Sequence, residues 1–325
     1  MRHRPLTRQD GGVTMELRRL GNSGLKVSAV GLGCNNFGGR MDEVETQRVV
    51  DAAIDYGITL LDTADVYGGT KSETFLGKAL QGKRHKVVLA TKFGMGQEEL
   101  ARGGSRRYIM QAVEASLKRL NTDYIDLYQM HRPDADTPID ETLMALDDLV
   151  RQGKVRYLGN SNFTGWQIAD ADWVSRTGHL NRFVSAQNQY SLLERGIEAE
   201  VLPACERFGL GMLPFFPLAS GLLTGKYKRN EPAPEGTRLA NAGPRAERAL
   251  SDRNFDVIDQ LTAFAEERGK TILDLAFAWL LSRGVISSVI AGATKVEQVQ
   301  SNVAAGEWRL TDEEFETVSE LARRR

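Results

Sequence analysis

The sequence predicts a single-domain (β/α)8 barrel, an α/β fold of the TIM-barrel type, and three observations support this. Eight short apolar runs alternate with amphipathic stretches of helical period along the chain. Residues 31–39, with the sequence GLGCNNFGG, lack the G-x-G-x-x-G turn that an open doubly wound sheet needs after its first strand. Polar side chains suited to proton transfer follow three of the runs, where barrel active sites form. An open doubly wound sheet is the alternative.

Composition limits the classes of protein to consider. The 325 residues are 41% hydrophobic and 26% charged, which is typical of a soluble globular protein with a large core. A net charge of −1 gives no electrostatic sign of a nucleic-acid or membrane partner. No apolar run reaches the ~20 residues that span a bilayer. Two cysteines without metal-ligand spacing favour a cytoplasmic protein without a metal site.

The first residues differ from the rest. Residues 1–14 are polar and basic, without the apolar centre of a secretory signal, and we predict a disordered leader there. The barrel domain is then expected over residues 15–325. It opens with a predicted β-hairpin, in which residues 17–20 and 25–28 flank the turn Gly21-Asn22-Ser23-Gly24. The eight apolar runs predict strands at residues 30–32, 59–61, 87–91, 124–129, 155–159, 184–187, 211–215 and 288–291.

Helical periodicity marks the segments between these strands. In residues 105–120, for example, Ile109, Val113 and Leu117 share one face. Ser72 is a suitable N-cap for the second helix. The predicted helices span residues 44–56, 72–80, 105–120, 137–150, 165–177, 196–208, 252–268, 271–282, 296–304 and, as an extra C-terminal helix, 312–322.

One long connection, residues 218–250, has little periodicity. It follows the seventh predicted strand, on the face where barrel active sites form. Because long ordered loops usually serve a function, we predict a lid or binding segment there. A disordered surface insertion is the alternative.

Four side chains form the candidate catalytic site. One apolar run ends at Asp62, and Tyr67 follows five residues later in a glycine-bounded turn; two other runs stop at Lys92 and His131. Neighbouring parallel strands bring these residues to one end of the sheet, as a proton-handling site. Taken singly, each has an ordinary structural role: a packed rim tyrosine, a capping aspartate, a solvated lysine and a turn histidine.

Seven motifs stand in order along the chain: GITLLDTA at 57–64 with Tyr67-Gly68, Lys92, DLYQMH at 126–131, GNSNF at 159–163, QNQYSLL at 187–193, PLASGLLTGKY at 217–227, and GATK at 292–295 followed by Gln298 and Asn302. In these motifs the chain resembles the aldo-keto reductases, over essentially all of residues 15–325. The last two motifs are similar to the bacterial and channel-subunit branches. The resemblance implies a barrel capped by an N-terminal hairpin, and an NADPH-dependent carbonyl reductase without a Rossmann domain or a metal.

The resemblance assigns a role to each catalytic candidate, and the chemistry of the residues agrees. Tyr67 would be the general acid that protonates the carbonyl oxygen. A phenol with a pKa near ~10 is a reluctant donor, and the Lys92 ammonium would lower that pKa. Asp62 would hold Lys92 charged and oriented. His131 would hydrogen-bond the substrate oxygen or help to relay protons.

The cofactor residues are expected from the same resemblance. Ser161, Asn162 and Gln187 match the positions that hold the nicotinamide carboxamide, and Phe215 matches the aromatic residue that stacks on the nicotinamide ring. Phe215 and Phe216 stand where Tyr and Ser are common in the family; two core phenylalanines are the alternative reading. Leu218, Gly221, Leu223 and Lys226 match a segment that covers the pyrophosphate, and Pro217 is a further expected cofactor-binding residue. A solvated lysine is the alternative for Lys226, and Arg238 is a further candidate for a cofactor contact.

The expected adenosine end lies at the predicted helix 296–304, whose N-terminus suits phosphate. Lys295 would bind the 2′-phosphate of NADP, and Gln298 and Asn302 would contact adenosine. Gly292 and Thr294 complete this end of the site. Gly292 and Gln298 stand where some branches of the aldo-keto reductase family have basic residues. Selectivity for NADP would therefore rest mainly on Lys295.

The substrate is a small-molecule carbonyl compound, which the sequence does not specify further. Phe37, Val66, Met95 and Trp166 predict an apolar pocket mouth, and nothing nearby marks a dedicated anion pocket. A regulatory subunit that binds NADPH, like the channel β-subunits of similar sequence, is the second functional hypothesis. A metal-dependent hydrolase is the third, but only His131 fits the ligand set it requires. The oligomeric state is not predicted.

Overall fold

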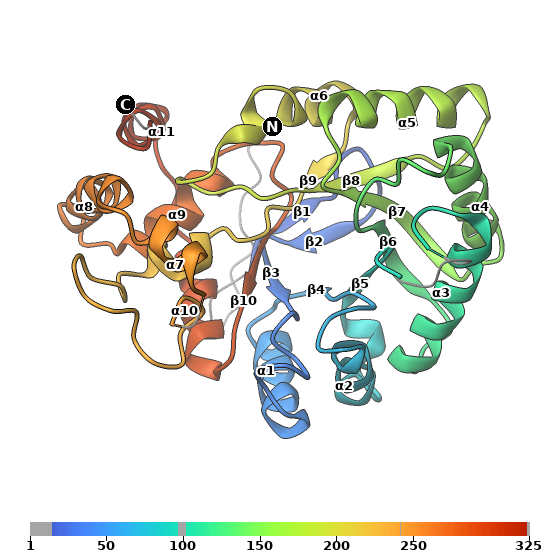
Figure 1. Cartoon of the computed structure of the whole chain (residues 1–325), viewed down its shortest axis with the longest axis horizontal. Coiled ribbons are helices and arrows are strands. Elements are labelled where there is room, and N and C mark those ends of the chain that lie inside the picture. Colours follow the sequence, from blue (N-terminus) through green and yellow to red (C-terminus); the bar gives the residue numbers. More distant parts are fainter. Residues whose placement is uncertain (1–14, 97–101, 241, 324–325) are drawn as a thin grey trace, which may run out of the picture.

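The computed structural model describes residues 15–96, 102–240 and 242–323. The predicted leader at residues 1–14 lies outside the described residues. Eight parallel strands curl into a barrel in the order β10-β3-β4-β5-β6-β7-β8-β9 (Figure 1). The predicted fold class is therefore confirmed. The strands are β3 (Val30–Gly33), β4 (Leu60–Asp62), β5 (Val88–Phe93), β6 (Ile125–Met130), β7 (Val155–Ser161), β8 (Phe183–Gln187), β9 (Gly211–Met212) and β10 (Val289–Gly292).

Hydrogen bonds between β9 and the segment that leads into β10 close the barrel. Met212 N–H donates to the Val285 carbonyl at 2.8 Å, and Ser287 N–H donates to the Met212 carbonyl at 3.0 Å. Strand β9 is shorter than the predicted run of residues 211–215, because Pro214 has no N–H for a ladder bond. Phe215 instead forms an isolated bridge with Gln189.

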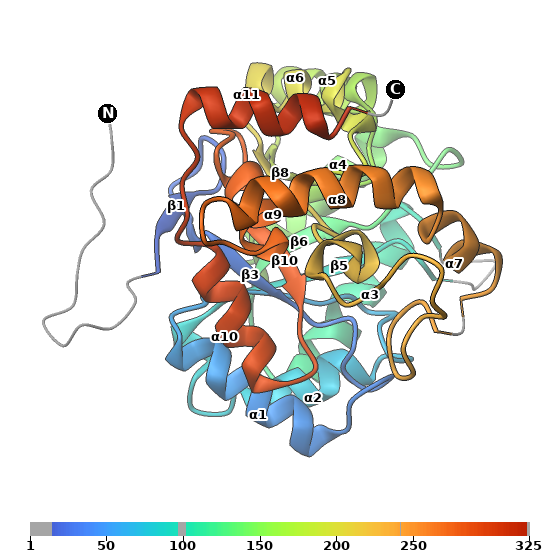
Figure 2. The same cartoon turned by 90° about the vertical axis from the view of Figure 1, so that its left-hand side faces the viewer.

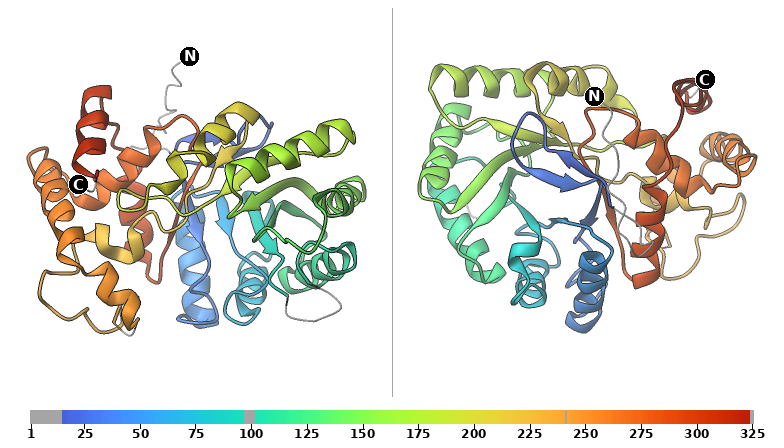
Figure 3. Two further views of the ribbon diagram at one scale, coloured as in Figure 1. Left: turned by 45° about the horizontal axis from the view of Figure 1, so that its top comes forward. Right: turned by 180° about the vertical axis from the view of Figure 1, so that it is seen from behind.

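An antiparallel hairpin of β1 (Leu17–Arg19) and β2 (Lys26–Ser28) crosses the end of the barrel where the strands begin (Figure 3, right). Arg18 fixes it there by donating to the carbonyl oxygens of Leu281 at 2.9 Å and Ile286 at 3.1 Å. The hairpin thus closes the end opposite to the strand ends that carry the candidate catalytic residues.

Helices surround the barrel, as two perpendicular views show (Figures 1 and 2). Those between barrel strands are α1 (Glu43–Asp55), α2 (Lys71–Ala79), α3 (Arg106–Leu120), α4 (Ile139–Arg151), α5 (Gly165–Thr177), α6 (Val201–Phe208), α7 (Pro244–Ala249), α8 (Asp252–Glu266) and α9 (Ile272–Leu281). After the last strand follow α10 (Val296–Ala305) and the predicted extra helix, α11 (Asp312–Leu321). Short 3₁₀ turns are η1 (Arg84–Lys86), η2 (Gly196–Glu198) and η3 (Ala219–Thr224).

Three local predictions need correction. Ser72 is not an N-cap: α2 begins at Lys71, and the buried Ser72 hydroxyl donates to the Cys34 carbonyl at 2.8 Å. The helix predicted at residues 196–208 is interrupted, with η2 before α6. The described parts of the connection over residues 218–250 contain η3 and α7, so the alternative of a disordered insertion is not supported there.

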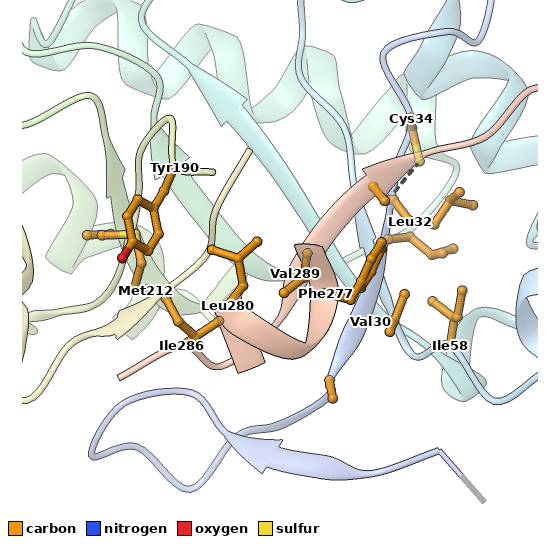
Figure 4. Close-up of a cluster of buried hydrophobic side chains, with 14 of the residues drawn as sticks. Val30, Leu32, Cys34, Ile58, Tyr190, Met212, Phe277, Leu280, Ile286 and Val289 are labelled. Carbon is orange, nitrogen blue, oxygen red and sulfur yellow. Dashed lines mark hydrogen bonds between the residues drawn. The ribbon is translucent and has the colours of Figure 1, made fainter. Parts of the chain in front are cut away.

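Apolar side chains fill two layers. A small cluster inside the barrel contains Leu20, Leu60, Leu127 and Ile290, of which Leu20 comes from the hairpin region. A larger cluster lies between strands and helices, where Val30, Val289, Phe277 and Leu280 pack together (Figure 4). Each such side chain contributes roughly 1.5–3 kcal/mol when it is fully buried. The packed interior therefore supports the polar residues at the carboxyl ends of the strands.

Candidate active site

The structure brings the four catalytic candidates together. Asp62 is the last residue of β4, Lys92 lies in β5, His131 directly follows β6, and Tyr67 lies in the turn before α2. Lys92 Nζ lies 2.6 Å from Asp62 Oδ2 and 3.3 Å from the Tyr67 hydroxyl. The Tyr67 and His131 rings meet edge to face, with centroids 5.8 Å apart. An acid, an amine and a phenol thus form one chain that ends at Tyr67.

Asp62 has further partners that sequence reasoning missed. Its Oδ1 accepts hydrogen bonds from Gln187 Nε2 at 2.8 Å and Gln129 Nε2 at 3.0 Å. Besides Asp62 and Tyr67, Lys92 Nζ has a third partner, because it donates to the Thr63 carbonyl at 2.9 Å. Such a fully bonded carboxylate stays in one orientation, so it fixes the ammonium that faces Tyr67. The only signal for Gln129 in the sequence is its place next to the end of a strand.

The protonation states follow from burial and charge. Burial alone would lower the pKa of Lys92, but the charge of Asp62 and the Tyr67 contact outweigh it, and the pKa is raised. Burial raises the pKa of Tyr67, and the opposing effect of Lys92 does not cancel it. The predicted effect of Lys92, which lowers the pKa of Tyr67, is present in this structure, but the effect of burial is larger. Tyr67 holds its proton at neutral pH beside a charged Lys92.

His131 is neutral at physiological pH. Burial, with smaller contributions from Lys92 and Arg132, lowers its pKa to about 3. Its Nδ1 is buried and has no hydrogen-bond partner among the described residues. A neutral imidazole can donate one hydrogen bond to a carbonyl oxygen without exchanging its proton.

A cavity of about 860 Å³ opens at the carboxyl ends of the strands. Every predicted catalytic or cofactor-binding residue except Lys92 lines it, and Lys92 lies behind Asp62 and Tyr67. The lining residues predicted from sequence are Asp62, Tyr67, His131, Ser161, Asn162, Gln187, Phe215, Pro217, Leu218, Gly221, Lys226, Arg238, Gly292, Thr294, Lys295, Gln298 and Asn302. Sequence reasoning missed other lining residues, among them Asn35, Asn36, Arg40, Arg132 and Glu235.

One part of the cavity is framed by amides and aromatic rings. Ser161 Oγ donates to the Gln187 carbonyl at 2.8 Å, and Asn162 Nδ2 donates to the His131 carbonyl at 2.9 Å. Phe215 and Phe216 meet edge to face, with centroids 5.3 Å apart. Because both phenylalanines line the cavity, the alternative reading of two core residues is not supported.

Three cations gather in another part of the cavity. Burial lowers the pKa of Lys226, and the charges of Arg40 and Arg238 lower it further. Arg40 donates to the Gly236 carbonyl, and Arg238 reaches Asn35 and Asn36 at 3.4 Å. Mutually repelling cations at a cavity wall form a favourable place for a bound anion.

Backbone geometry supports this arrangement. Ala219, Ser220 and Gly221 have φ values of +47°, +61° and +96°, a left-handed run that is costly outside glycine. A Cβ on Gly221 would lie 2.6 Å from Lys226 Nζ, so Lys226 passes directly over this turn. Strain of this kind is typical of a segment shaped for a ligand.

The remaining predicted residues lie around the start of α10. Lys295 is the exposed N-cap residue of this helix. Gln298 Oε1 accepts from the Thr294 N–H at 2.7 Å, so Gln298 closes the helix start in this structure. Asn302 lies one turn further and is buried beside the cavity.

The residues predicted to form an apolar mouth do not line the cavity. Phe37 is fully buried and belongs to the larger apolar cluster. Val66 and Trp166 are exposed, with 63% of Trp166 accessible. None of the four predicted residues is among those that line the cavity.

A buried, hydrogen-bonded Asp–Lys–Tyr chain at the floor of a barrel cavity, with a cationic region further along it, is a site for carbonyl chemistry with an anionic cofactor. Residues 29–323 match the Aldo/keto reductase family. The chain belongs to this family, whose members carry out nicotinamide-dependent oxidoreduction of carbonyl compounds.

Individual relatives agree over almost the full length. The chain is 39% identical over 321 residues to "Uncharacterized oxidoreductase YrpG" of Bacillus subtilis (strain 168), covering 94% of this chain and 96% of that protein. It is 38% identical over 298 residues to "Probable voltage-gated potassium channel subunit beta" of Oryza sativa subsp. japonica, covering 90% and 91%. It is 35% identical over 310 residues to "Probable aldo-keto reductase 1" of Glycine max, covering 93% and 87%.

Among residues 15–96, 102–240 and 242–323, no group of three or more His, Cys, Asp or Glu side chains is placed to hold a metal ion. Within the same ranges, none of the helices combines the length and apolar character that crossing a membrane requires.

Proposed function

We propose that this protein is an NADPH-dependent reductase of aldehydes or ketones, with Tyr67 as the general acid. The observation that carries the proposal is the Tyr67–Lys92–Asp62 chain at the floor of the cavity. It holds a protonated phenol next to a buried ammonium, so negative charge that forms on the phenol oxygen is stabilised at once.

The residues fit a dinucleotide cofactor. Phe215 offers a ring face for stacking, and Lys226, Arg40 and Arg238 offer positive charge for phosphate groups. Lys295, at the start of α10, is the proposed partner of the 2′-phosphate. Ser161, Asn162 and Gln187 would hold the carboxamide, and Gly292, Thr294, Gln298 and Asn302 would surround adenosine.

When bound, the cofactor supplies a hydride to the carbonyl carbon. The protein must then deliver one proton to the carbonyl oxygen, so that aldehyde, NADPH and H⁺ become alcohol and NADP⁺. Tyr67 donates this proton while His131, which is neutral, donates a hydrogen bond to the same oxygen. Lys92 stabilises the tyrosinate that is left until solvent returns the proton, and Asp62 keeps Lys92 charged and in place.

The test is Tyr67→Phe, assayed by loss of NADPH absorbance with activated aldehydes. We expect turnover to fall by about 100-fold, the usual scale for a lost general acid, with NADPH affinity little changed. Tyr157→Phe is the matched control, because Tyr157 packs in the barrel-interior cluster next to the hairpin. Wild-type turnover in Tyr67→Phe would remove Tyr67 from the mechanism.

A second function is favoured by the relatives that are named as potassium channel β-subunits. In that case the chain would bind NADPH and act through a partner protein. Tight NADPH binding without turnover of any carbonyl compound would support this reading. For the enzyme, we propose a cytoplasmic location.

A further inference from the structure

Arg132 lies beside the catalytic residues and is not used by the mechanism above. It lines the cavity together with Tyr67 and His131. The backbone before it is held from two sides: His131 N–H donates to the Phe93 carbonyl at 2.8 Å, and Asn162 Nδ2 donates to the His131 carbonyl at 2.9 Å. The guanidinium therefore extends from a fixed point at the end of β6.

No acid in the described part of the chain neutralises the charge of Arg132. Its side chain forms no ion pair or hydrogen bond with any residue that the structure describes, and it is exposed to solvent. Two described acids that follow Arg132 in the sequence already have other partners. Asp134 accepts from the Gly104 N–H at 2.8 Å and the Thr137 hydroxyl at 2.7 Å, while Asp136 pairs with Arg102 at 3.0 Å.

Arg132 also acts on a different part of the cavity from the other cations. Its charge is one cause of the lowered pKa of His131, whereas the charges of Arg40 and Arg238 act on Lys226. The cationic group around Lys226 therefore belongs to the proposed phosphate end. Arg132 belongs to the end where the carbonyl oxygen would bind.

We propose that Arg132 binds a carboxylate on the substrate, so that the preferred substrates are aldehydes or ketones that carry a carboxylate away from the carbonyl group. The inference rests on the proposed reductase function. A planar guanidinium forms two parallel hydrogen bonds with a carboxylate, which orients the substrate as well as binding it. This proposal differs from the expectation from sequence that nothing near the site marks a dedicated anion pocket.

The test compares two aldehydes of similar shape and different charge, 4-carboxybenzaldehyde and methyl 4-formylbenzoate. For Arg132→Gln we expect kcat/KM to fall by about tenfold or more on the acid, mainly through KM, and by less than about twofold on the ester. Arg132→Lys should retain part of the preference. Arg102→Gln is the matched control, because Arg102 is an exposed arginine paired with Asp136 outside the cavity lining.

Equal effects of Arg132→Gln on both aldehydes, or no effect on either, would overturn the inference. NADPH binding by tryptophan fluorescence checks that the variant is folded. If it is not folded, the wild-type enzyme gives the answer: rising salt should raise KM for the acid but not for the ester, and parallel behaviour would refute the role of Arg132. Turnover of neither aldehyde by the wild-type protein would instead contradict the proposed function.

Discussion

Asp65, two residues before Tyr67, is a buried carboxyl group in an unfavourable setting. Burial raises its pKa to about 6, although the hydrogen bond from Tyr108, at 3.0 Å, works in the opposite direction. Its Oδ1 has no hydrogen-bond partner among the described residues. The fold therefore prefers the protonated form, and a charged Asp65 weakens the fold at neutral pH.

This setting predicts a pH-dependent effect of Asp65→Asn. Because the folded pKa is raised above the unfolded value of 3.8, the contribution of Asp65 is fully present below that value and is lost as pH rises through about 6. The uncharged variant should exceed the wild-type free energy of unfolding by on the order of 2 kcal/mol at pH 8. The advantage should disappear near pH 4. Urea unfolding at both pH values measures it.

Asp134→Asn is the control with the opposite sign. Burial raises the pKa of Asp134, but hydrogen bonds from Gly104, Thr137 and Asp136 outweigh it, and the pKa is lowered. Its contribution is present above the unfolded pKa, so this variant should lose stability at pH 8. An Asp65→Asn variant with the same stability as the wild type at pH 8 would contradict the pKa argument.

For single residues, the sequence predicts which side chains lie at the site better than it predicts their hydrogen-bond partners and pKa values. The positions of Asp62, Lys92 and His131 are predictable because the carboxyl ends of parallel strands meet at one edge of the sheet. An error in the exact strand boundaries does not change that edge. Gln129 was missed, since alternation along a buried strand does not reveal which amide reaches Asp62. The raised pKa of Tyr67 depends on the depth of burial, which only the assembled barrel determines.

Among the elements, α2 follows directly on the turn that carries Tyr67, and its packing depends on one glycine. A Cβ on Gly77 would meet the Arg119 carbonyl oxygen at 2.6 Å and Leu120 backbone atoms at 2.7 Å. The two helices are joined further by the buried Glu73, which accepts from Arg119 at 2.6 Å. The close approach of α2 to the end of α3 therefore requires a residue without a side chain.

Gly77→Ala should consequently destabilise the protein. In a free helix the change is favourable by up to ~1 kcal/mol. Overpacking against a fixed backbone costs about 1–3 kcal/mol, so we expect a net loss of on the order of 1 kcal/mol in thermal or urea unfolding. Gly284→Ala is the control, since no atom lies within 4 Å of its added Cβ, and it should be nearly neutral. A more stable Gly77→Ala variant would show that α2 moves freely.

Element boundaries were the least predictable part of the fold. Ser72 has the residue type of an N-cap, but its hydroxyl is taken by the Cys34 carbonyl inside the fold. Strand β9 ends at Met212, before Pro214, and the long connection after it contains η3, which no periodicity indicates. For Ser72 a tertiary contact overrides the local preference of the sequence, whereas the end of β9 follows from a proline that the predicted run ignored.

In the whole molecule, the closed barrel brings together segments that are far apart in the sequence, and these segments line the cavity. Cavity residues come from the β3–α1 connection, from the segment after β9 and from the start of α10. A ligand that contacts all three binds the folded chain and not the unfolded chain. Its binding free energy is therefore added to the free energy of unfolding.

The proposed NADP selectivity of Lys295 is testable through this coupling. At a ligand concentration of about 100 times Kd the stabilisation is about 2.7 kcal/mol, which should raise the Tm of the wild-type protein by several degrees with NADPH. NADH at the same concentration should raise it less, because it lacks the 2′-phosphate. Lys295→Ala should reduce the NADPH shift to the NADH value and leave the NADH shift unchanged, since Lys295 is an exposed N-cap without a side-chain cap bond. If the variant loses both shifts alike, Lys295 supports the start of α10 and does not read the 2′-phosphate; if it loses neither, the selectivity lies with Arg40, Lys226 or Arg238.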